Sequence, residues 1–456
     1  FYHSPDTSQQ TSYVYVNSGT MEFHAPESAG AVFSYRSQGL AGAPDAVFVN
    51  EGDINIYGTK SMGIGFNTGG DPTTGTGGQG IRKGTKFIFK KPVKLFGDTT
   101  VGFYNMENNL TKANESFSTF RAIIGENDNK KVYSQTQSDG TTKNFTAASN
   151  VSGKEEKWVD NAVGIYNKIA PTGKLEIKVP ELTIKKYSKD GVGVYAESGK
   201  ISIEEGNISI EGGEGNIGLY SVGGPIEYKG NITMGPSGDS GNINGNEGNQ
   251  DGKSNIGLFS KKEITMTGDL VTENTHGKAK DSTVLYADNG GKITIDDEYD
   301  GAVPTPNKVR ESKVDIKLVY GKTGENTAIF SKGENSLITL KSKTRKINID
   351  GTKSDGTASN KGVGLFAQDG GKIQVNGTAL TNGTEITIKN GASALVSMGK
   401  DSNNIASQID AKYSKIEYDG NGYAVYSDGI GKVDLSGAEL TLKGKSTAFD
   451  VDLTPS

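Results

Sequence analysis

The chain has 456 residues with 64 Gly, 12 Pro and no Cys, only 33% of its residues are hydrophobic, and its net charge is −5. This charge excludes a general nucleic-acid-binding role, and no apolar run approaches the roughly 18–20 residues that span a bilayer. The apolar residues are spread too evenly for large separate cores, while 19 Tyr, 16 Phe and many short aliphatic alternations argue against disorder.

Residues 1–104 contain the first copies of a short phrase of Gly, aliphatic and aromatic residues. Loose copies read Gly-Ala-Val-Phe-Ser at 30–34, Gly-Ile-Gly-Phe at 63–66 and Val-Gly-Phe-Tyr at 101–104. The start of the chain has no initiator Met and neither the basic nor the apolar region of a signal peptide. We therefore expect a piece excised from a longer chain.

Residues 105–160 separate two copies of the phrase and differ from the rest in composition. They contain Phe117, Phe120, Arg121, Tyr133 and Trp158, which is the only Trp of the chain. Insertions that protrude from a repeat protein are common binding surfaces. The sequence therefore predicts a protruding subdomain at 105–160, with these five residues as candidate ligand-binding residues.

Residues 161–456 carry the clearest copies of the phrase, which recurs about a dozen times in the chain. Two of them read Gly-Val-Gly-Val-Tyr-Ala at 191–196 and Gly-Val-Gly-Leu-Phe-Ala at 362–367. Two alternating segments follow the first, Lys-Ile-Ser-Ile-Glu at 200–204 and Asn-Ile-Ser-Ile-Glu at 207–211. One repeat therefore has three short strands joined by turns, about 25 residues in all.

Period-2 alternation places Ile201, Ile203, Ile208 and Ile210 on one face of their strands. Three such faces close a triangular tube, in which backbone hydrogen bonds join successive coils about 4.8 Å apart. Gly and Asn allow the positive φ angles of the corners, and the chirality of parallel crossovers makes the tube right-handed. The predicted fold is all-β: a right-handed parallel β-helix of three-strand coils with loop insertions. We expect coils at 1–104 and 161–456, extra residues mostly just before each phrase, and a monomer.

The aromatic residue of each phrase has two interpretations. Strict alternation places Val192 and Val194 inside and Tyr195 outside, which would create an exposed stripe that stacks sugars or docks a partner. Alternatively, the aromatic residue begins a corner and packs inward or beneath the insertions.

Motifs for catalysis and metal binding are weak. Gly-Asp-Ser-Gly at 238–241 matches a serine-protease phrase, but the chain has only three scattered His residues and the phrase lies in a Gly/Asn-rich stretch. With no Cys, a zinc site is not expected, and Asn-Ile-Asn-Gly-Asn at 242–246 is a poor calcium loop. We predict no enzymatic activity, no cofactor and no metal.

Two basic clusters are either solvated strand faces or sites for an anionic glycan or a lipopolysaccharide headgroup. The first cluster lies around a predicted strand at 86–89 and comprises Arg82, Lys83, Lys86, Lys90, Lys91 and Lys94. The second comprises Lys341, Lys343, Arg345 and Lys346.

The phrases at 191–196 and 362–367, with the Gly-Lys-Ile strands that follow them, resemble passenger domains of the very large fusobacterial-type autotransporter adhesins, which use type V secretion. The resemblance covers 160–456 clearly and 1–104 more loosely. It implies a β-helical passenger on the bacterial cell surface, anchored in the outer membrane by a C-terminal β-barrel that this sequence does not contain. It also implies attachment, as a virulence factor, to host cells or other bacteria through surface glycans or receptor proteins. No catalytic residues carry over.

Two other classes of function stay open at this point. A β-helical lyase or glycosidase needs acidic or basic residues clustered on one face, whereas the acids here are scattered along the chain. A purely structural stalk needs no site.

Overall fold

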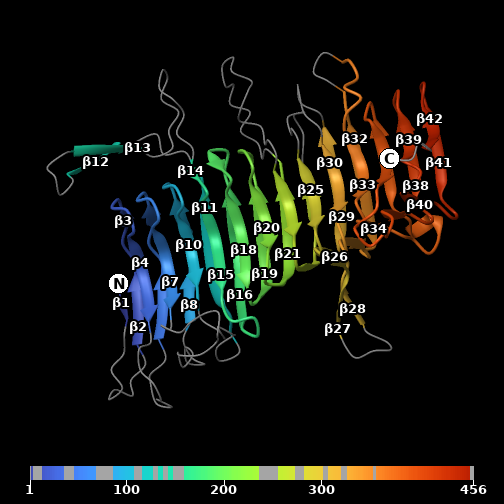
Figure 1. Cartoon of the computed structure of the whole chain (residues 1–456). Helices are drawn as coiled ribbons and strands as arrows, with labels where there is room; N and C mark the ends of the chain where they lie inside the picture. The colour runs from blue at the N-terminus through green and yellow to red at the C-terminus, as the bar shows by residue number, and fades with distance from the viewer. Residues whose placement is uncertain are drawn as a thin grey trace. The chain divides into compact units, whose positions relative to one another are not determined.

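The computed structural model describes residues 2–3, 13–34, 46–67, 86–106, 116–126, 132–136, 142–146, 159–235, 255–272, 282–300, 307–319, 326–352 and 356–451. The chain divides into two compact units, one of Phe1–Ser209 with Leu219–Glu227 and the other of Ile210–Gly218 with Tyr228–Ser456. Each unit is a parallel β-helix whose coils contribute one strand to each of three walls (Figure 1). We name the walls A, B and C in chain order.

In the first unit, wall A carries the phrase, and walls B and C carry the two strands that follow it. Wall A contains β1 (Tyr2–His3), β4 (Ala29–Ser34), β7 (Met62–Asn67), β10 (Val101–Asn105), β15 (Val163–Lys168) and β18 (Val192–Ser198). Wall B contains β2 (Tyr13–Asn17), β5 (Ala46–Asn50) and β8 (Lys86–Phe89), and wall C contains β3 (Met21–Phe23), β6 (Ile54–Ile56) and β9 (Val93–Leu95). The longer strands β11 (Ser118–Ile124), β16 (Lys174–Ile184) and β19 (Lys200–Ile210) run through both walls. Short pairs are β12 (Val132–Thr136) with β13 (Thr142–Thr146) and β14 (Val159–Asp160) with β17 (Ser188–Lys189).

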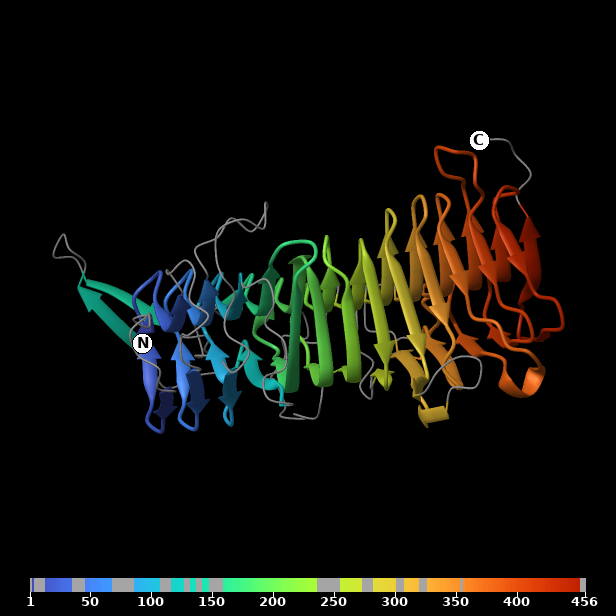
Figure 2. The same cartoon turned by 90° about the horizontal axis from the view of Figure 1, so that it is seen from below.

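The second unit repeats this order of walls (Figure 2). Wall A contains β22 (Ile256–Ser260), β25 (Thr283–Asp288), β30 (Thr327–Lys332), β33 (Val363–Gln368), β36 (Ser393–Met398), β39 (Tyr423–Ser427) and β42 (Thr447–Val451). Wall B contains β23 (Glu263–Thr267), β26 (Lys292–Asp296), β31 (Leu337–Leu340), β34 (Lys372–Gln374), β37 (Gln408–Asp410) and β40 (Lys432–Asp434). Wall C contains β24 (Leu270–Thr272), β29 (Lys313–Val319), β32 (Thr344–Asp350), β35 (Glu385–Lys389), β38 (Lys415–Asp419) and β41 (Glu439–Lys443). The strands β20 (Ile217–Ser221) and β21 (Ile226–Met234) have residues in both units.

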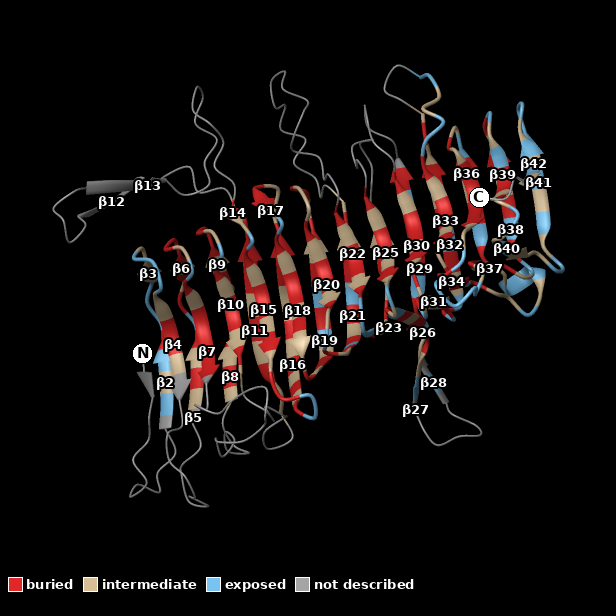
Figure 3. Cartoon of the chain, in the orientation of Figure 1, coloured by how far each residue is buried: buried red, intermediate tan, exposed pale blue. Residues whose placement is uncertain are grey.

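The core of each unit consists of aliphatic ladders, in which one inner residue lies directly over the next. On wall B of the second unit, Ile293 pairs in register with Ile264 and with Ile338. On wall C, Ile347 pairs with Ile316. All of these side chains are buried, and the buried positions alternate along the strands (Figure 3). The predicted parallel β-helix of three-strand coils is therefore confirmed.

Wall A departs from the strict alternation that the sequence predicts. In β18 both Gly193 and Val194 are buried, whereas Val192 and Tyr195 are half-buried on the outer side. The prediction that Val192 points inward is therefore wrong. The equivalent glycine of the preceding coil shows how tight this position is, because a Cβ on Gly164 would lie 2.6 Å from the carbonyl oxygen of Gly193.

Corners use the positive φ angles that Gly and Asn allow. Between walls A and B of one coil, Asn289 has φ 44° and Gly290 has φ 90°. The corresponding corner of the next coil contains Gly333 with φ 84°. These residues turn the chain from one wall to the next without the steric penalty that other side chains would meet.

Two insertions of the second unit lie at a corner that the sequence analysis did not anticipate, between walls B and C. One is an antiparallel hairpin, β27 (Glu298–Asp300) with β28 (Asn307–Arg310), which extends away from the coils in Figure 1. The other is a loop at 375–384 with the 3₁₀ helix η1 (Leu380–Asn382). The coil between them has a short corner at 341–343.

The ladders predict that replacing a buried isoleucine by alanine lowers the stability of the fold far more than replacing an exposed one. We expect Ile347→Ala, at a fully buried rung, to destabilise the fold by about 2–5 kcal/mol because it leaves a cavity between coils. Ile405, which is 42% exposed, is the matched control, and its replacement by Ala should have little effect. Urea denaturation of both variants measures this, and equal unfolding midpoints would contradict the ladder as the source of stability.

Candidate functional site

The five residues predicted to bind a ligand at 105–160 have different surroundings. Phe120 lies in β11, fully buried against Phe89 and Phe103 at ring-centroid distances of 5.3 and 5.8 Å, so it is a core residue. In the same strand, Arg121 donates to Glu181 Oε2 at 3.1 Å. Part of the predicted insertion is therefore a strand of the coil, because Ser118–Ile124 pairs with its neighbours β8, β9 and β16.

The remaining three candidates are Phe117, Tyr133 and Trp158. Phe117 is half-buried, and Lys178 Nζ lies 6.0 Å from the centre of its ring. Tyr133 lies in β12 opposite Phe145, and Trp158 lies outside the described residues. A ligand site in the insertion stays a prediction, as do the boundaries at 105 and 160.

The aromatic residues of wall A form continuous stacks in each unit. In the first unit, Tyr166 stacks on Tyr104 and Tyr195 with centroids 5.1 and 5.3 Å apart. In the second, Phe259, Tyr286, Phe330 and Phe366 follow one another at 4.7, 4.9 and 4.9 Å, with interplanar angles of 6°, 12° and 20°.

Stacking occupies the ring faces of these aromatic residues. A sugar packs against the face of an aromatic ring, and within a stack each face already contacts the next ring. Burial, with a contribution from Asp288, raises the pKa of Tyr286 to about 12. The aromatic residues of these stacks are half-buried, and their contacts stabilise the stacking of coils. Because their ring faces are occupied, they make poor platforms for a sugar.

The first basic cluster is paired with acids. Lys90 contacts Glu51 at 2.6 Å, and Lys91 contacts Asp53 at 3.5 Å. Lys94 likewise contacts Glu126 at 2.7 Å. Arg82 and Lys83 lie outside the described residues. This cluster fits solvated strand faces better than an anion site.

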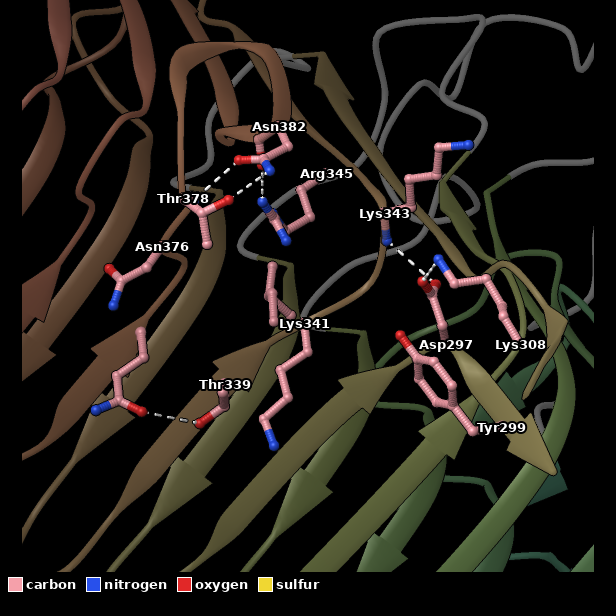
Figure 4. A pocket seen from close by; sticks show the side chains of 13 residues that line it. Asp297, Tyr299, Lys308, Thr339, Lys341, Lys343, Arg345, Asn376, Thr378 and Asn382 are labelled. Atoms are coloured by element: carbon pink, nitrogen blue, oxygen red, sulfur yellow. Dashed lines mark hydrogen bonds and ion pairs between the residues drawn. The ribbon is translucent and has the colours of Figure 1, made fainter. Parts of the chain in front are cut away.

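Three residues of the second basic cluster, Lys341, Lys343 and Arg345, line a groove of about 480 Å³ on the second unit (Figure 4). The groove forms because β31 pairs with β26 on one side and β34 on the other, and both of those neighbouring coils carry insertions at the B–C corner. The hairpin β27–β28 makes one wall, and the loop at 375–384 makes the other. The short corner at 341–343 is the floor. We call this feature the corner groove.

Polar and aromatic side chains line the corner groove. The hairpin side contributes Asp297, Tyr299 and Lys308. The floor contributes Thr339, Leu340, Lys341, Lys343 and Arg345. The loop side contributes Gln374, Asn376, Gly377, Thr378 and Asn382. In Figure 4 the Lys341 side chain extends between Thr339 and Tyr299.

Asp297 anchors the hairpin wall. Its Oδ1 accepts hydrogen bonds from the backbone N–H groups of Ser312 at 2.8 Å and Lys343 at 3.1 Å, and its Oδ2 lies 2.6 Å from Lys308 Nζ on β28. Burial opposes ionisation of Asp297, but the hydrogen bonds from Lys308, Ser312 and Lys343 outweigh it and lower its pKa. The carboxylate therefore stays charged at neutral pH and connects the hairpin to the coil.

Arg345 anchors the opposite wall. Its buried guanidinium donates to the Ser342 carbonyl at 2.7 Å, to Thr384 Oγ1 at 3.0 Å and to the Asn382 carbonyl. Desolvation lowers the pKa of Arg345, and Asp297 acts in the opposite direction. This side chain holds the loop at 375–384 in place, so it shapes the groove without offering a free charge to a ligand.

The corner groove has few acidic lining residues. Glycoside hydrolysis needs a pair of carboxyl groups, whereas Asp297 is the one acid among the lining residues, and it already has three hydrogen-bond partners. In the described part of the chain, His, Cys, Asp and Glu form no cluster of three that could hold a metal ion. Gly-Asp-Ser-Gly at 238–241 lies outside the described residues.

Sequence reasoning identified only part of this groove. Lys341, Lys343 and Arg345 line it as a cluster, whereas Lys346 pairs with Glu385 at 3.0 Å and is not a lining residue. Tyr299 and the amides of the loop were missed. The signal that would have found Tyr299 is the number of residues between the successive strands at 292–296 and 313–319, which exceeds what a corner needs.

Comparisons with known proteins identify no relative: no family model, no curated protein and no solved structure matches the chain. Among the residues that the structure describes, no helix has the length and apolar character to cross a membrane.

The Asp297 anchor predicts a pH-dependent stability. Its pKa is lowered in the folded state, so its contribution is present above the ordinary Asp pKa of about 3.9 and is lost as the pH falls through the folded-state value. We expect Asp297→Asn to lower the Tm by about 2–4 °C at pH 7, and the difference from the wild type to shrink as the pH falls below the ordinary Asp pKa.

Thermal unfolding at a series of pH values measures this difference. Asp288→Asn is the control, because Asp288 lies 3.8 Å from its partner Lys261 and anchors no insertion. A Tm difference for Asp297→Asn that does not change with pH would contradict the role of its charge.

Proposed function

We propose that the chain is a segment of a bacterial cell-surface adhesin, an autotransporter passenger, that attaches to host cells or other bacteria by binding surface glycans in the corner groove. The observation that carries the proposal is the lining of the groove, where an exposed tyrosine, two exposed lysines and side-chain amides converge over a single coil corner. Surface display and anchoring rest on the resemblance of the repeated phrase alone.

The size of the groove supports a small, polar ligand. Its volume of about 480 Å³ falls in the range of small-molecule sites, and its walls stand on coils that are two strand spacings apart, about 10 Å. Glycans are recognised by a few hydrogen-bonding groups with an aromatic ring beside them. A flat receptor protein would instead need a broad complementary surface.

The competing functions fit the groove less well. A hydrolase lacks its second carboxylate among the lining residues, as described above. A purely structural stalk has no need of two insertions that flank one short corner. Both buried anchors, Asp297 and Arg345, hold these insertions in defined positions. Ordered walls of this kind favour a preorganised binding site.

Tyr299 provides the most direct test of glycan binding. It is 48% exposed on the hairpin wall, and its ring is the only aromatic surface among the lining residues. We expect Tyr299→Ala to weaken binding to a glycan array by about tenfold, because it removes a packing surface worth roughly 1–1.5 kcal/mol.

Tyr423→Ala is the matched control, since Tyr423 is 40% exposed on wall A and does not line the groove. Cell attachment is measured in parallel with the array. Equal binding by both variants would contradict the corner groove as the glycan site. Loss of attachment only on removal of β12–β13, at 132–146, would place the site in the predicted insertion instead. Release of reducing ends or unsaturated sugars from polysaccharides would support an enzyme.

A further inference from the structure

We infer that the corner groove selects an acidic sugar, of the uronic acid class, and that Lys341 is the residue that binds its carboxylate. This inference rests on the proposed function and specifies its ligand. It depends on how the charges of the groove are already paired, on which hydrogen-bonding groups point outward, and on the position of Tyr299.

The cations of the groove differ in how firmly they are engaged. Lys308 lies 2.6 Å from Asp297, and the guanidinium of Arg345 is committed to Ser342, Asn382 and Thr384. Lys343 lies 2.7 Å from Glu311. Lys308 and Arg345 are held by buried partners, whereas the pair of Lys343 and Glu311 is exposed, at 58% and 50%, but short.

Lys341 differs from the other three. Its side chain is 59% exposed, and its ion pair with Asp296 is long, 3.9 Å between Nζ and Oδ2. Exposed pairs of this kind contribute about 0–1 kcal/mol, so the ammonium exchanges its partner at little cost. Counted together, the four cations face the three carboxylates of Asp296, Asp297 and Glu311. Arg345 is the cation left without a carboxylate, but its guanidinium is buried among neutral oxygens, so the most weakly paired exposed cation of the groove is Lys341.

The neutral groups that line the corner groove include two side-chain amides, which have NH₂ donors. Gln374 Oε1 accepts from Thr339 Oγ1 at 3.4 Å, and Asn376 Oδ1 accepts from the backbone N–H of Lys412 at 3.3 Å. The NH₂ group of each amide is a hydrogen-bond donor, and each amide oxygen keeps a second lone pair. An ammonium beside two amide donors matches a ligand rich in acceptors, as a carboxylate-bearing sugar is.

Tyr299 completes the site on the side opposite these amides. Lys308 Nζ lies 5.8 Å from the ring centroid, so the hairpin itself holds the ring in position. In Figure 4 Lys341 lies between this ring and Asn376. A pyranose ring packed on Tyr299 would place its substituents over Lys341, which makes the carboxylate and the ring face two parts of one recognition surface.

The test compares a short galacturonic acid oligosaccharide with its methyl ester, which has the same rings without the charge. We expect the full chain to bind the acid at least about tenfold more tightly than the ester in calorimetry, because a charge-assisted hydrogen bond supplies this difference. Lys341→Gln should abolish the preference. Lys389→Gln should keep it, since Lys389 is matched in exposure, 54%, and in its ion pair, 3.8 Å to Asp350, but lies outside the groove.

The outcomes separate the inference from the proposed function. One outcome is that the wild type binds the acid and the ester with equal affinity and that Tyr299→Ala loses binding to both. That result would overturn the selection of acidic sugars and leave glycan binding in the groove in place. A preference for the acid that persists in Lys341→Gln would overturn the role of Lys341. Binding of neither sugar would overturn the inference, and unchanged cell attachment by Tyr299→Ala would then overturn the glycan-binding groove as well. Equal Tm values of the lysine variants and wild type verify that the fold is retained.

Discussion

Pairing between successive coils is the constraint on which each unit depends. In the ladders an inner aliphatic residue lies over an equivalent residue one coil away, as Ile293 does between Ile264 and Ile338, and the backbone hydrogen bonds of the walls hold that register. A parallel wall buries its aliphatic face only when the register is kept, because a slip of one residue would turn the inner set outward. The aromatic stacks of wall A follow from the same register, with centroids 4.7–4.9 Å apart in the second unit.

Corners are free of this constraint, and the candidate site arises from that freedom. The B–C corner of one coil consists only of residues 341–343. The same corner holds a hairpin in one neighbouring coil and a loop with a 3₁₀ helix in the other. Strand pairing is uninterrupted on either side, since β32 pairs with β29 and with β35. Three coils of unequal corner length thus make a groove without any change to the ladders. Asp297 and Arg345 then fix its two walls.

Local patterns in the sequence predicted the strands well, because period 2 and bounding Gly or Asn residues reflect the backbone directly. The segments at 200–204 and 207–211 are indeed strand, within β19. The same rule misplaced Val192, since close contact between wall A glycines breaks the alternation. Phe120 was assigned to a protruding insertion on composition, although Phe120, Ala122 and Ile124 alternate as inner residues of β11.

The site was less predictable than the fold. Lys341 and Lys343 were identified because they are close in sequence, but Tyr299 and Asn376 reach them only through corner lengths in coils about 40 residues away. A four-residue Gly-Ser insertion between Ser342 and Lys343 tests the account most directly, because it lengthens the floor of the groove and leaves the ladders intact. The account predicts loss of glycan binding together with a cooperative thermal unfolding transition whose Tm falls by no more than about 2–4 °C, because the insertion disturbs only the contacts of Ser342 and Lys343 with Arg345 and Asp297. Glycan binding that persists in the folded variant would contradict the corner groove as the site, and a collapse of stability would contradict the independence of corners and ladders.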